Sequence, residues 1–129
     1  MTTAILSALA QEQSGLLAAL QRPVRAQHAW RSFSSGVLHG QPVVLALSGI
    51  GKVAAATTAS ALIERFGATR IVFTGVAGGV GDGVNVGDVV VARSYVQHDM
   101  DASPLFARWL VPGYADICLP CDSELSALL

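Results

Sequence analysis

The apolar residues of the chain fall in short runs, and the spacing within each run predicts a helix or a strand. Residues 4–9 form an apolar run typical of a buried strand, and the leucines of residues 11–20 share one face of a predicted helix. Pro23 is expected to end that helix. Residues 30–38 and 42–47 read as two strands joined by a tight turn at a histidine and a glycine.

The middle of the chain carries the clearest helical pattern. Apolar residues recur at three- and four-residue spacing over residues 53–66, and Gly67 is placed to cap the C-terminus of this helix. Residues 71–73 and 88–92 are predicted strands. Their apolar residues are consecutive rather than alternating, which indicates strands covered on both faces, so the predicted class is α/β.

The last third of the chain is mostly irregular. Prolines and aromatic residues scattered over residues 97–120 predict a long loop. Asp122 or Ser123 resembles a helix cap, and the helix that follows has barely two turns, as if cut short. The length fits one domain over residues 1–129, expected to be the N-terminal portion of a larger one.

Composition and charge narrow the classes of function. Hydrophobic residues make up 52% and charged residues only 13%, so exposed apolar area is expected to require a partner, either a second subunit or a missing half of the fold. A net charge of -1 without a basic stripe argues against nucleic-acid binding and membrane-surface binding. The chain shows no cationic leader and no apolar run of membrane-spanning length, which predicts a cytoplasmic protein.

Two glycine-bearing segments follow predicted strands, at residues 48–52 and 74–79. The dinucleotide fingerprint is absent, because neither Gly79-Val80-Gly81 nor Gly81-Asp82-Gly83 has a third glycine three residues further on. The phosphate loop is absent too, because Gly51-Lys52 is followed by valine and position 46 is alanine rather than glycine. Ligands bind at strand ends in open α/β sheets, and small residues let a flat ring approach the backbone closely. These segments therefore predict a pocket, although glycines that only form tight turns explain the pattern equally well.

Glu12 is the only acidic residue among the first sixty-three positions, and it lies in the first turn of the first predicted helix. The helix N-terminus stabilises the anion, whereas burial in a pocket raises the pKa of a carboxyl group, so the two effects oppose each other. Glu12 is accordingly a candidate base. The alternative is an exposed acid that only complements the helix dipole.

Two further groups have weaker claims to chemistry. His98, Asp99 and Asp101 form a polar cluster that suits a hydrogen-bonded pair ordering a loop better than a metal site. Cys118 and Cys121 have the spacing of a redox pair or half a zinc site, but no second pair completes a metal site. Two reduced thiols without special function are expected.

Five motifs in register resemble the 5'-methylthioadenosine/S-adenosylhomocysteine nucleosidases. In order along the chain they are Leu9-Ala10-Gln11-Glu12, Ser48-Gly49-Ile50-Gly51-Lys52-Val53-Ala54-Ala55, Thr74-Gly75-Val76-Ala77-Gly78-Gly79, Val86-Gly87-Asp88-Val89-Val90-Val91 and His98-Asp99-Met100-Asp101. The resemblance implies an α/β fold of the nucleoside phosphorylase type, with three layers and a central mixed sheet. It also implies a homodimer that uses no metal and no organic cofactor.

The resemblance assigns roles to individual residues. Glu12 matches the glutamate that holds and activates the attacking water in that family. The residues that match the purine and ribose pocket are Leu9, Ile50, Val76, Ala77 and Gly78. The loop that covers the alkylthio group bound by the neighbouring subunit corresponds to a segment containing Ala102, Phe106 and Pro112, where Leu105 is an alternative to Phe106.

The implied reaction is hydrolysis of the N-glycosidic bond of methylthioadenosine or S-adenosylhomocysteine, which releases adenine. The family's second acid, an aspartate that protonates the purine, has no match here, since Asp116, Asp122 and Glu124 lie in different contexts. The chain alone is therefore expected to be inactive. Alternatives are another nucleoside phosphorylase, a futalosine-type hydrolase or a non-catalytic nucleoside-binding fragment.

Overall fold

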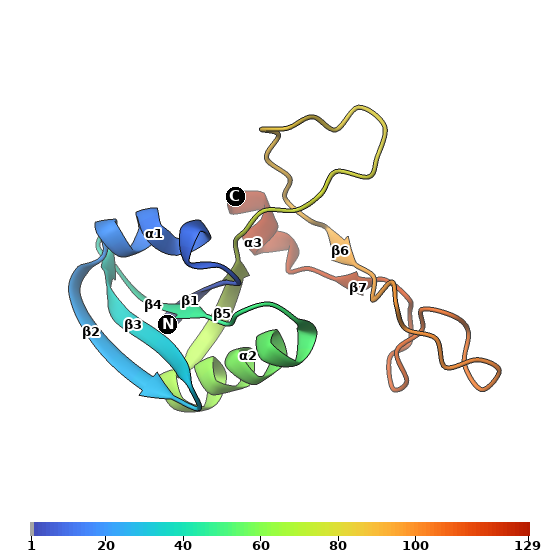
Figure 1. Ribbon diagram of the computed structural model, residues 1–129, viewed down its shortest axis with the longest axis horizontal. Helices are drawn as coiled ribbons and strands as arrows, with labels where there is room; N and C mark the ends of the chain where they lie inside the picture. Colours follow the sequence, from blue (N-terminus) through green and yellow to red (C-terminus); the bar gives the residue numbers. More distant parts are fainter. Residues whose placement is uncertain (1) are drawn as a thin grey trace. The chain divides into compact units, whose positions relative to one another are not determined.

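The computed structural model describes residues 2–129, which form two compact units divided between Gly78 and Gly79. The first unit holds a five-stranded sheet with two long helices, and the second is largely irregular (Figure 1). The prediction of one domain over residues 1–129 remains a prediction. No helix within residues 2–129 is long and apolar enough to cross a membrane.

The sheet of the first unit is mixed, with the strand order β2-β3-β4-β1-β5. Strand β1 runs parallel to both of its neighbours, β4 and β5, whereas β2, β3 and β4 form an antiparallel meander. The strands are β1 (Thr2–Ser7), β2 (Gln21–His28), β3 (Arg31–Leu38), β4 (Gln41–Leu47) and β5 (Ala68–Phe73).

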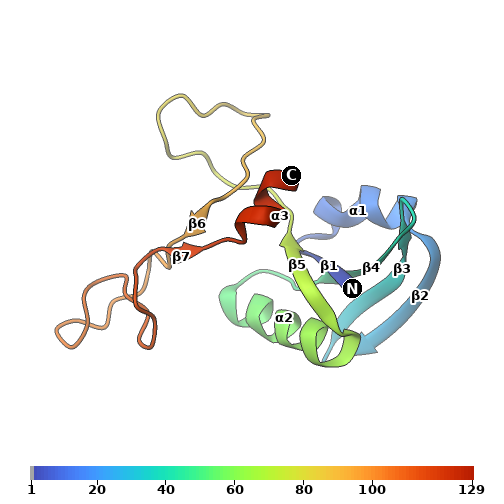
Figure 2. The same ribbon diagram turned by 180° about the vertical axis from the view of Figure 1, so that it is seen from behind.

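Two helices cover opposite faces of this sheet, α1 (Ala10–Ala19) and α2 (Lys52–Phe66) (Figures 1 and 2). Alternate residues of each strand face one helix or the other. One cluster packs Leu62 of α2 against Ala4, Leu6, Val44 and Ala46, with Phe33 and Ala68 alongside. The other packs Leu16 of α1 against Ile5, Val43 and Leu45, with Leu20 and Leu38 alongside. The expected three-layer α/β fold with a central mixed sheet is confirmed.

The strand β2 was not predicted, and its chemistry explains why. The sequence of Gln21–His28 is polar, and nearly all of its residues are exposed at the edge of the sheet, so no apolar pattern marks it. Pro23 lies inside this strand rather than ending the helix, which already stops at Ala19. An edge strand accepts proline because its missing N–H leaves no central ladder bond unmade.

The second unit contains a two-stranded ladder of β6 (Ser94–Tyr95) and β7 (Leu119–Pro120), followed by helix α3 (Ser123–Leu128). Asp122 caps α3 by accepting a hydrogen bond from the backbone N–H of Leu125 at 2.9 Å. The chain between the two strands is irregular, as the sequence predicts for residues 97–120, except that the loop ends in β7.

The predicted strand at residues 88–92 is wrong. This segment has no regular structure, and Val89 and Val90 are exposed rather than covered on two faces. The preference of valine for strands reflects packing against neighbouring strands, and no segment among residues 2–129 pairs with these valines.

Candidate functional site

Three parallel strands end side by side and bring three chain segments together. The carboxyl ends of β1, β4 and β5 lie at one edge of the sheet. Beyond the strands, the N–H of Ser48 donates to the carbonyl of Ser7 at 2.9 Å, and the N–H of Thr74 donates to the carbonyl of Leu6 at 3.0 Å. The segments after β4 and β5 therefore flank the segment that leads from β1 into α1.

Glu12 lies at the meeting point of two of these segments. Its Oε2 accepts hydrogen bonds from the backbone N–H groups of Ala8 at 3.0 Å and Leu9 at 2.8 Å. Its Oε1 accepts one from the N–H of Val76, after β5, at 3.0 Å. Glu12 is the third residue of α1, so the bond to Leu9 is the acidic half of a helix capping box. The carboxylate thus links the start of α1 to the segment after β5.

Gly75 allows this close approach. A Cβ atom placed on Gly75 would lie 2.8 Å from Oε1 of Glu12, closer than real Cβ atoms come, and 3.0 Å from its Cδ, which is already a tight contact. Glycine at this position therefore serves the carboxylate, and the tight-turn explanation does not account for it.

The helix N-terminus and burial are expected to shift the pKa of Glu12 in opposite directions, and the hydrogen bonds decide the direction. The amides of Val76, Leu9 and Ala8 together lower the pKa of Glu12 below its ordinary value of 4.5, with Val76 as the largest cause, while burial raises it less. The side chain is only partly buried. Glu12 is therefore a carboxylate at neutral pH. Of the roughly four lone-pair positions of a carboxylate, three are occupied by amides, so about one remains, on Oε1.

The other predicted pocket residues lie on the same three segments. Leu9 precedes α1, Ile50 is in the turn after β4, and Val76, Ala77 and Gly78 follow β5. All five are exposed. The structure brings Leu9 and Val76 to the Glu12 carboxylate through their amides. Their role in binding a nucleoside remains a prediction.

The glycines after β4 have a conformational role. Gly49 and Gly51 have φ angles of 77° and 110°, which residues with side chains rarely adopt. Gly51 is also the N-cap of α2, where its carbonyl accepts from the N–H of Ala55. The backbone conformation of this turn therefore favours glycine at both positions, and a ligand-binding role of the turn remains a prediction.

The predicted lid residues lie in the irregular part of the second unit. The carbonyl of Ala102 accepts hydrogen bonds from the N–H groups of Leu105 and Phe106 in one turn. Leu105 is 85% exposed and Phe106 41%, and Pro112 is also exposed. Neither residue is singled out by these contacts, so the choice between Leu105 and Phe106 is still open. The covering of a neighbouring site remains a prediction.

The acidic cluster after residue 96 orders its own loop. Oδ1 of Asp101 accepts hydrogen bonds from the hydroxyl of Ser103 at 2.6 Å and from its backbone N–H at 3.1 Å. These bonds, with a smaller contribution from the Arg108 charge, lower the pKa of Asp101. Residues 2–129 contain no group of three or more His, Cys, Asp or Glu side chains arranged to hold a metal ion.

Cys118 and Cys121 are both free, and the backbone between them is extended. Three extended residue steps span about 10 Å, whereas the Cα atoms of a disulfide lie within about 7 Å of each other. The redox-pair alternative is therefore not supported in this conformation. The backbone N–H of Cys121 donates to the carbonyl of Arg93 at 2.9 Å, just before β6. Burial and the neighbouring Cys121 raise the pKa of Tyr95 in that strand.

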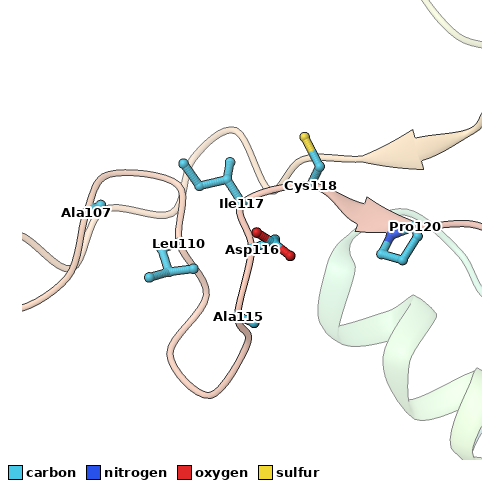
Figure 3. Close-up of a pocket in the computed structure, with 7 residues that line it drawn as sticks. All are labelled: Ala107, Leu110, Ala115, Asp116, Ile117, Cys118 and Pro120. Carbon is cyan, nitrogen blue, oxygen red and sulfur yellow. The ribbon is translucent and has the colours of Figure 1, made fainter.

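An open hollow of the second unit includes Cys118 (Figure 3). Its lining is mostly apolar, and Asp116 is its only charged residue. The lining residues are Ala107, Leu110, Ala115, Asp116, Ile117, Cys118 and Pro120. With one carboxylate and no facing base or cation, this hollow has no evident catalytic arrangement.

Sequence reasoning identified Glu12 but missed the groups that hold it. The amides of Ala8 and Val76 carry no side-chain signal. The position of Glu12 as third residue of a helix was the one available sign that the carboxylate reaches back to the preceding amides.

Comparison with known proteins places these features in a family. Residues 2–129 match the family model of the phosphorylase superfamily. A 5'-methylthioadenosine/S-adenosylhomocysteine nucleosidase of Chromohalobacter salexigens is 43% identical over 99 residues, which are 77% of this chain and 42% of the relative. An aminodeoxyfutalosine nucleosidase of Campylobacter jejuni is 35% identical over 129 residues, 99% of this chain and 56% of the relative.

The fold agrees with the sequence matches. The crystal structure of the methylthioadenosine/S-adenosylhomocysteine nucleosidase of Neisseria meningitidis, in complex with methylthio-immucillin-A, superposes with a TM-score of 0.94 at 35% identity. The match covers 98% of this chain and 55% of that one. The chain thus spans about half the length of the curated relatives it matches. It belongs to the phosphorylase superfamily, and its resemblance to the methylthioadenosine/S-adenosylhomocysteine nucleosidases within that superfamily is confirmed.

Proposed function

We propose that this chain supplies the water-activating half of a nucleosidase site, which hydrolyses the N-glycosidic bond of 5'-methylthioadenosine or S-adenosylhomocysteine and releases adenine. The observation that carries the proposal is the Glu12 carboxylate, which three backbone amides hold at the carboxyl ends of the parallel strands. The family membership and the similar nucleosidases support the same reaction class.

The lowered pKa of Glu12 suits a particular part in the reaction. Departure of the purine leaves an oxocarbenium-like ribose centre, which reacts readily with a weak nucleophile. A carboxylate that stays ionised orients a water molecule through its remaining lone pair, and its negative charge stabilises the cationic centre. Glu12 then takes up the water proton as the new C–O bond forms.

The substrate contacts follow from the segments that surround Glu12. Leu9, Ile50, Val76, Ala77 and Gly78 would line the purine and ribose pocket, and their exposure at the strand ends leaves them accessible to a ligand. Ala102, Phe106 and Pro112 would cover the alkylthio group bound by the other subunit of a homodimer. An apolar cover suits a thioether, which gains chiefly from leaving water. The proposed reaction needs no metal or organic cofactor.

The purine-protonating acid is the part that this chain does not match. Asp116 lines the hollow of the second unit, Asp122 caps α3, and Glu124 lies in the first turn of that helix. None follows a motif resembling the family's acid. We propose that this acid belongs to a segment corresponding to the other half of the relatives, and that residues 1–129 alone release adenine very slowly.

A futalosine-type substrate is the second candidate. The relative of Campylobacter jejuni is an aminodeoxyfutalosine nucleosidase and matches almost the whole chain. The Glu12 carboxylate, which would activate the water molecule, suits either substrate equally, because both reactions hydrolyse an N-glycosidic bond. The 5' substituent of the substrate would distinguish them.

The test measures base release by chromatography from three substrates: methylthioadenosine, S-adenosylhomocysteine and aminodeoxyfutalosine. Each is incubated with the 129-residue protein and with the same chain joined to the C-terminal half of a curated relative, with and without phosphate. We expect phosphate-independent adenine release from methylthioadenosine by the joined protein and at least about 10²-fold less by the short chain. A strict phosphate requirement would instead indicate a phosphorylase.

Thermal unfolding addresses the non-catalytic alternative. A nucleoside-binding fragment without catalysis is expected to be monodisperse, to gain thermal stability with methylthioadenosine, and to release no adenine even in the joined protein. That combination of results would replace the hydrolase proposal.

A further inference from the structure

A second pocket lies on the α1 face of the sheet in the first unit, over β2 and β3. The strand register fixes which side chains face it. Ser34 pairs with Leu45, whose side chain packs in the α1-side cluster, and Arg25 pairs with Ser34. Gln27 and Ser32 also form a register pair, two residues along each strand, so they point to the same face. Four polar side chains therefore gather on a face that is otherwise apolar.

These four polar side chains are available to bind a ligand. Within residues 2–129, the side chains of Arg25, Gln27, Ser32 and Ser34 make no hydrogen bond or ion pair with another residue. Ser34 is only 8% exposed. All four residues line the pocket, and no acidic residue does. The pocket thus offers one positive charge together with amide and hydroxyl donors, which is the chemistry that recognises an oxyanion.

The remaining wall is apolar and firmly placed. Leu17 of α1 and Leu47 of β4 line the pocket beside the polar groups. The helix is held there by Gln13, which is buried and donates from Nε2 to the carbonyl of Ala46 at 2.9 Å. The pocket volume is about 330 Å³, within the range of small-molecule sites although at its lower end.

We propose that this pocket binds a small organic monocarboxylate, with the carboxylate on Arg25 and the two serines and a short alkyl part against Leu17 and Leu47. A planar carboxylate matches the two-pronged guanidinium, and one cation balances one negative charge. Inorganic phosphate carries more charge and has no apolar part for the leucine wall. The lining shares no residue with the segments around Glu12 proposed to bind the nucleoside.

The pocket lies against α1, the helix that carries Glu12. Gln13, which lines the pocket, is the neighbour of Glu12 on α1. A carboxylate bound there would contact α1, which carries Glu12, and β4, which precedes the segment containing Ile50. The site is therefore placed to modulate the Glu12 region without taking part in the chemistry.

The experiment titrates the purified protein with sodium butyrate and follows backbone amide shifts by NMR. Butyramide, which has the same shape but no charge, and inorganic phosphate are the comparison ligands at equal ionic strength. We expect saturable shifts with butyrate at Gln27, Ser32 and Ser34, and neither saturation nor localisation with the other two ligands. This readout requires no turnover, so it is independent of the proposed nucleosidase activity.

Two charge-matched variants decide whether the site is specific. Arg25→Gln removes the guanidinium group proposed to bind the carboxylate. Arg70→Gln removes an exposed arginine of β5 that does not line the pocket. We expect Arg25→Gln to weaken butyrate binding at least tenfold and Arg70→Gln to leave it within twofold. Equal effects of the two variants, comparable binding of butyramide or phosphate, or the absence of saturation would overturn the proposal.

Discussion

Glu12 owes its state to backbone amides rather than to a charged partner. Three N–H groups from two segments point at one carboxylate, and together they outweigh the effect of burial on its pKa. Such an arrangement depends on backbone position, so a change that moves the segment after β5 should alter both the pKa and the local stability.

Gly75→Ala tests the space beside this carboxylate. The added methyl group would stand 2.8 Å from Oε1, so either the carboxylate or the backbone of the segment after β5 must move. We expect a loss of about 1–3 kcal/mol in the free energy of unfolding, measured by urea denaturation. Gly78→Ala is the control for stability, because no atom lies within 4 Å of the position that its added methyl group would take. Equal stabilities of the two variants would contradict the proposed packing.

The pKa of Glu12 predicts how its contribution to stability depends on pH. Because the folded-state pKa lies below the ordinary value of 4.5, the ionised carboxylate stabilises the fold above pH 4.5. That contribution is lost as the pH falls from 4.5 through the lowered pKa. We expect the difference in Tm between the wild type and Glu12→Gln to be constant above about pH 5.5 and to shrink below pH 4.5. A difference that grows on acidification would show that the pKa is raised.

At the scale of helices and strands, prediction succeeded where apolar periodicity or a glycine cap marks the element. The α2 helix ends at Phe66 and is capped by Gly67, whose φ of 62° is the left-handed conformation that the sequence pattern predicts for a capping glycine. It failed for β2, whose polar residues lie on an exposed edge, and for residues 88–92, whose valines have no partner strand among residues 2–129. Strand formation depends on neighbours that a local pattern does not contain.

Two glycines in or beside helices should respond oppositely to alanine. Gly67→Ala places a side chain in the left-handed region, and we expect a loss of about 1 kcal/mol in the free energy of unfolding. Gly15→Ala, inside α1 with open space around it, should gain about 0.5–1 kcal/mol. Urea unfolding curves of both variants measure the two changes, and a loss on Gly15→Ala would show that α1 tolerates no side chain there.

At the scale of the whole molecule, the sequence predicted the three-layer fold and the family but could not supply the site geometry. The resemblance placed Glu12, Leu9 and Val76 in one site, and the structure shows that the latter two meet the carboxylate through main-chain amides. Those contacts depend on the parallel pairing of β1 with β5, which no local pattern reveals. The high apolar content is reflected in exposed residues such as Val86 and Leu105, which a partner subunit or the other half of the fold would cover.

The central claim is that the Glu12 carboxylate holds the hydrolytic water, and Glu12→Gln tests it most directly. Glutamine has nearly the same shape but cannot take up the water proton or stabilise the cationic ribose centre. In the joined protein with methylthioadenosine, we predict that kcat for adenine release falls by about 10²- to 10⁴-fold while KM changes little. An unchanged kcat would contradict the account, because the carboxylate would then have no part in the reaction.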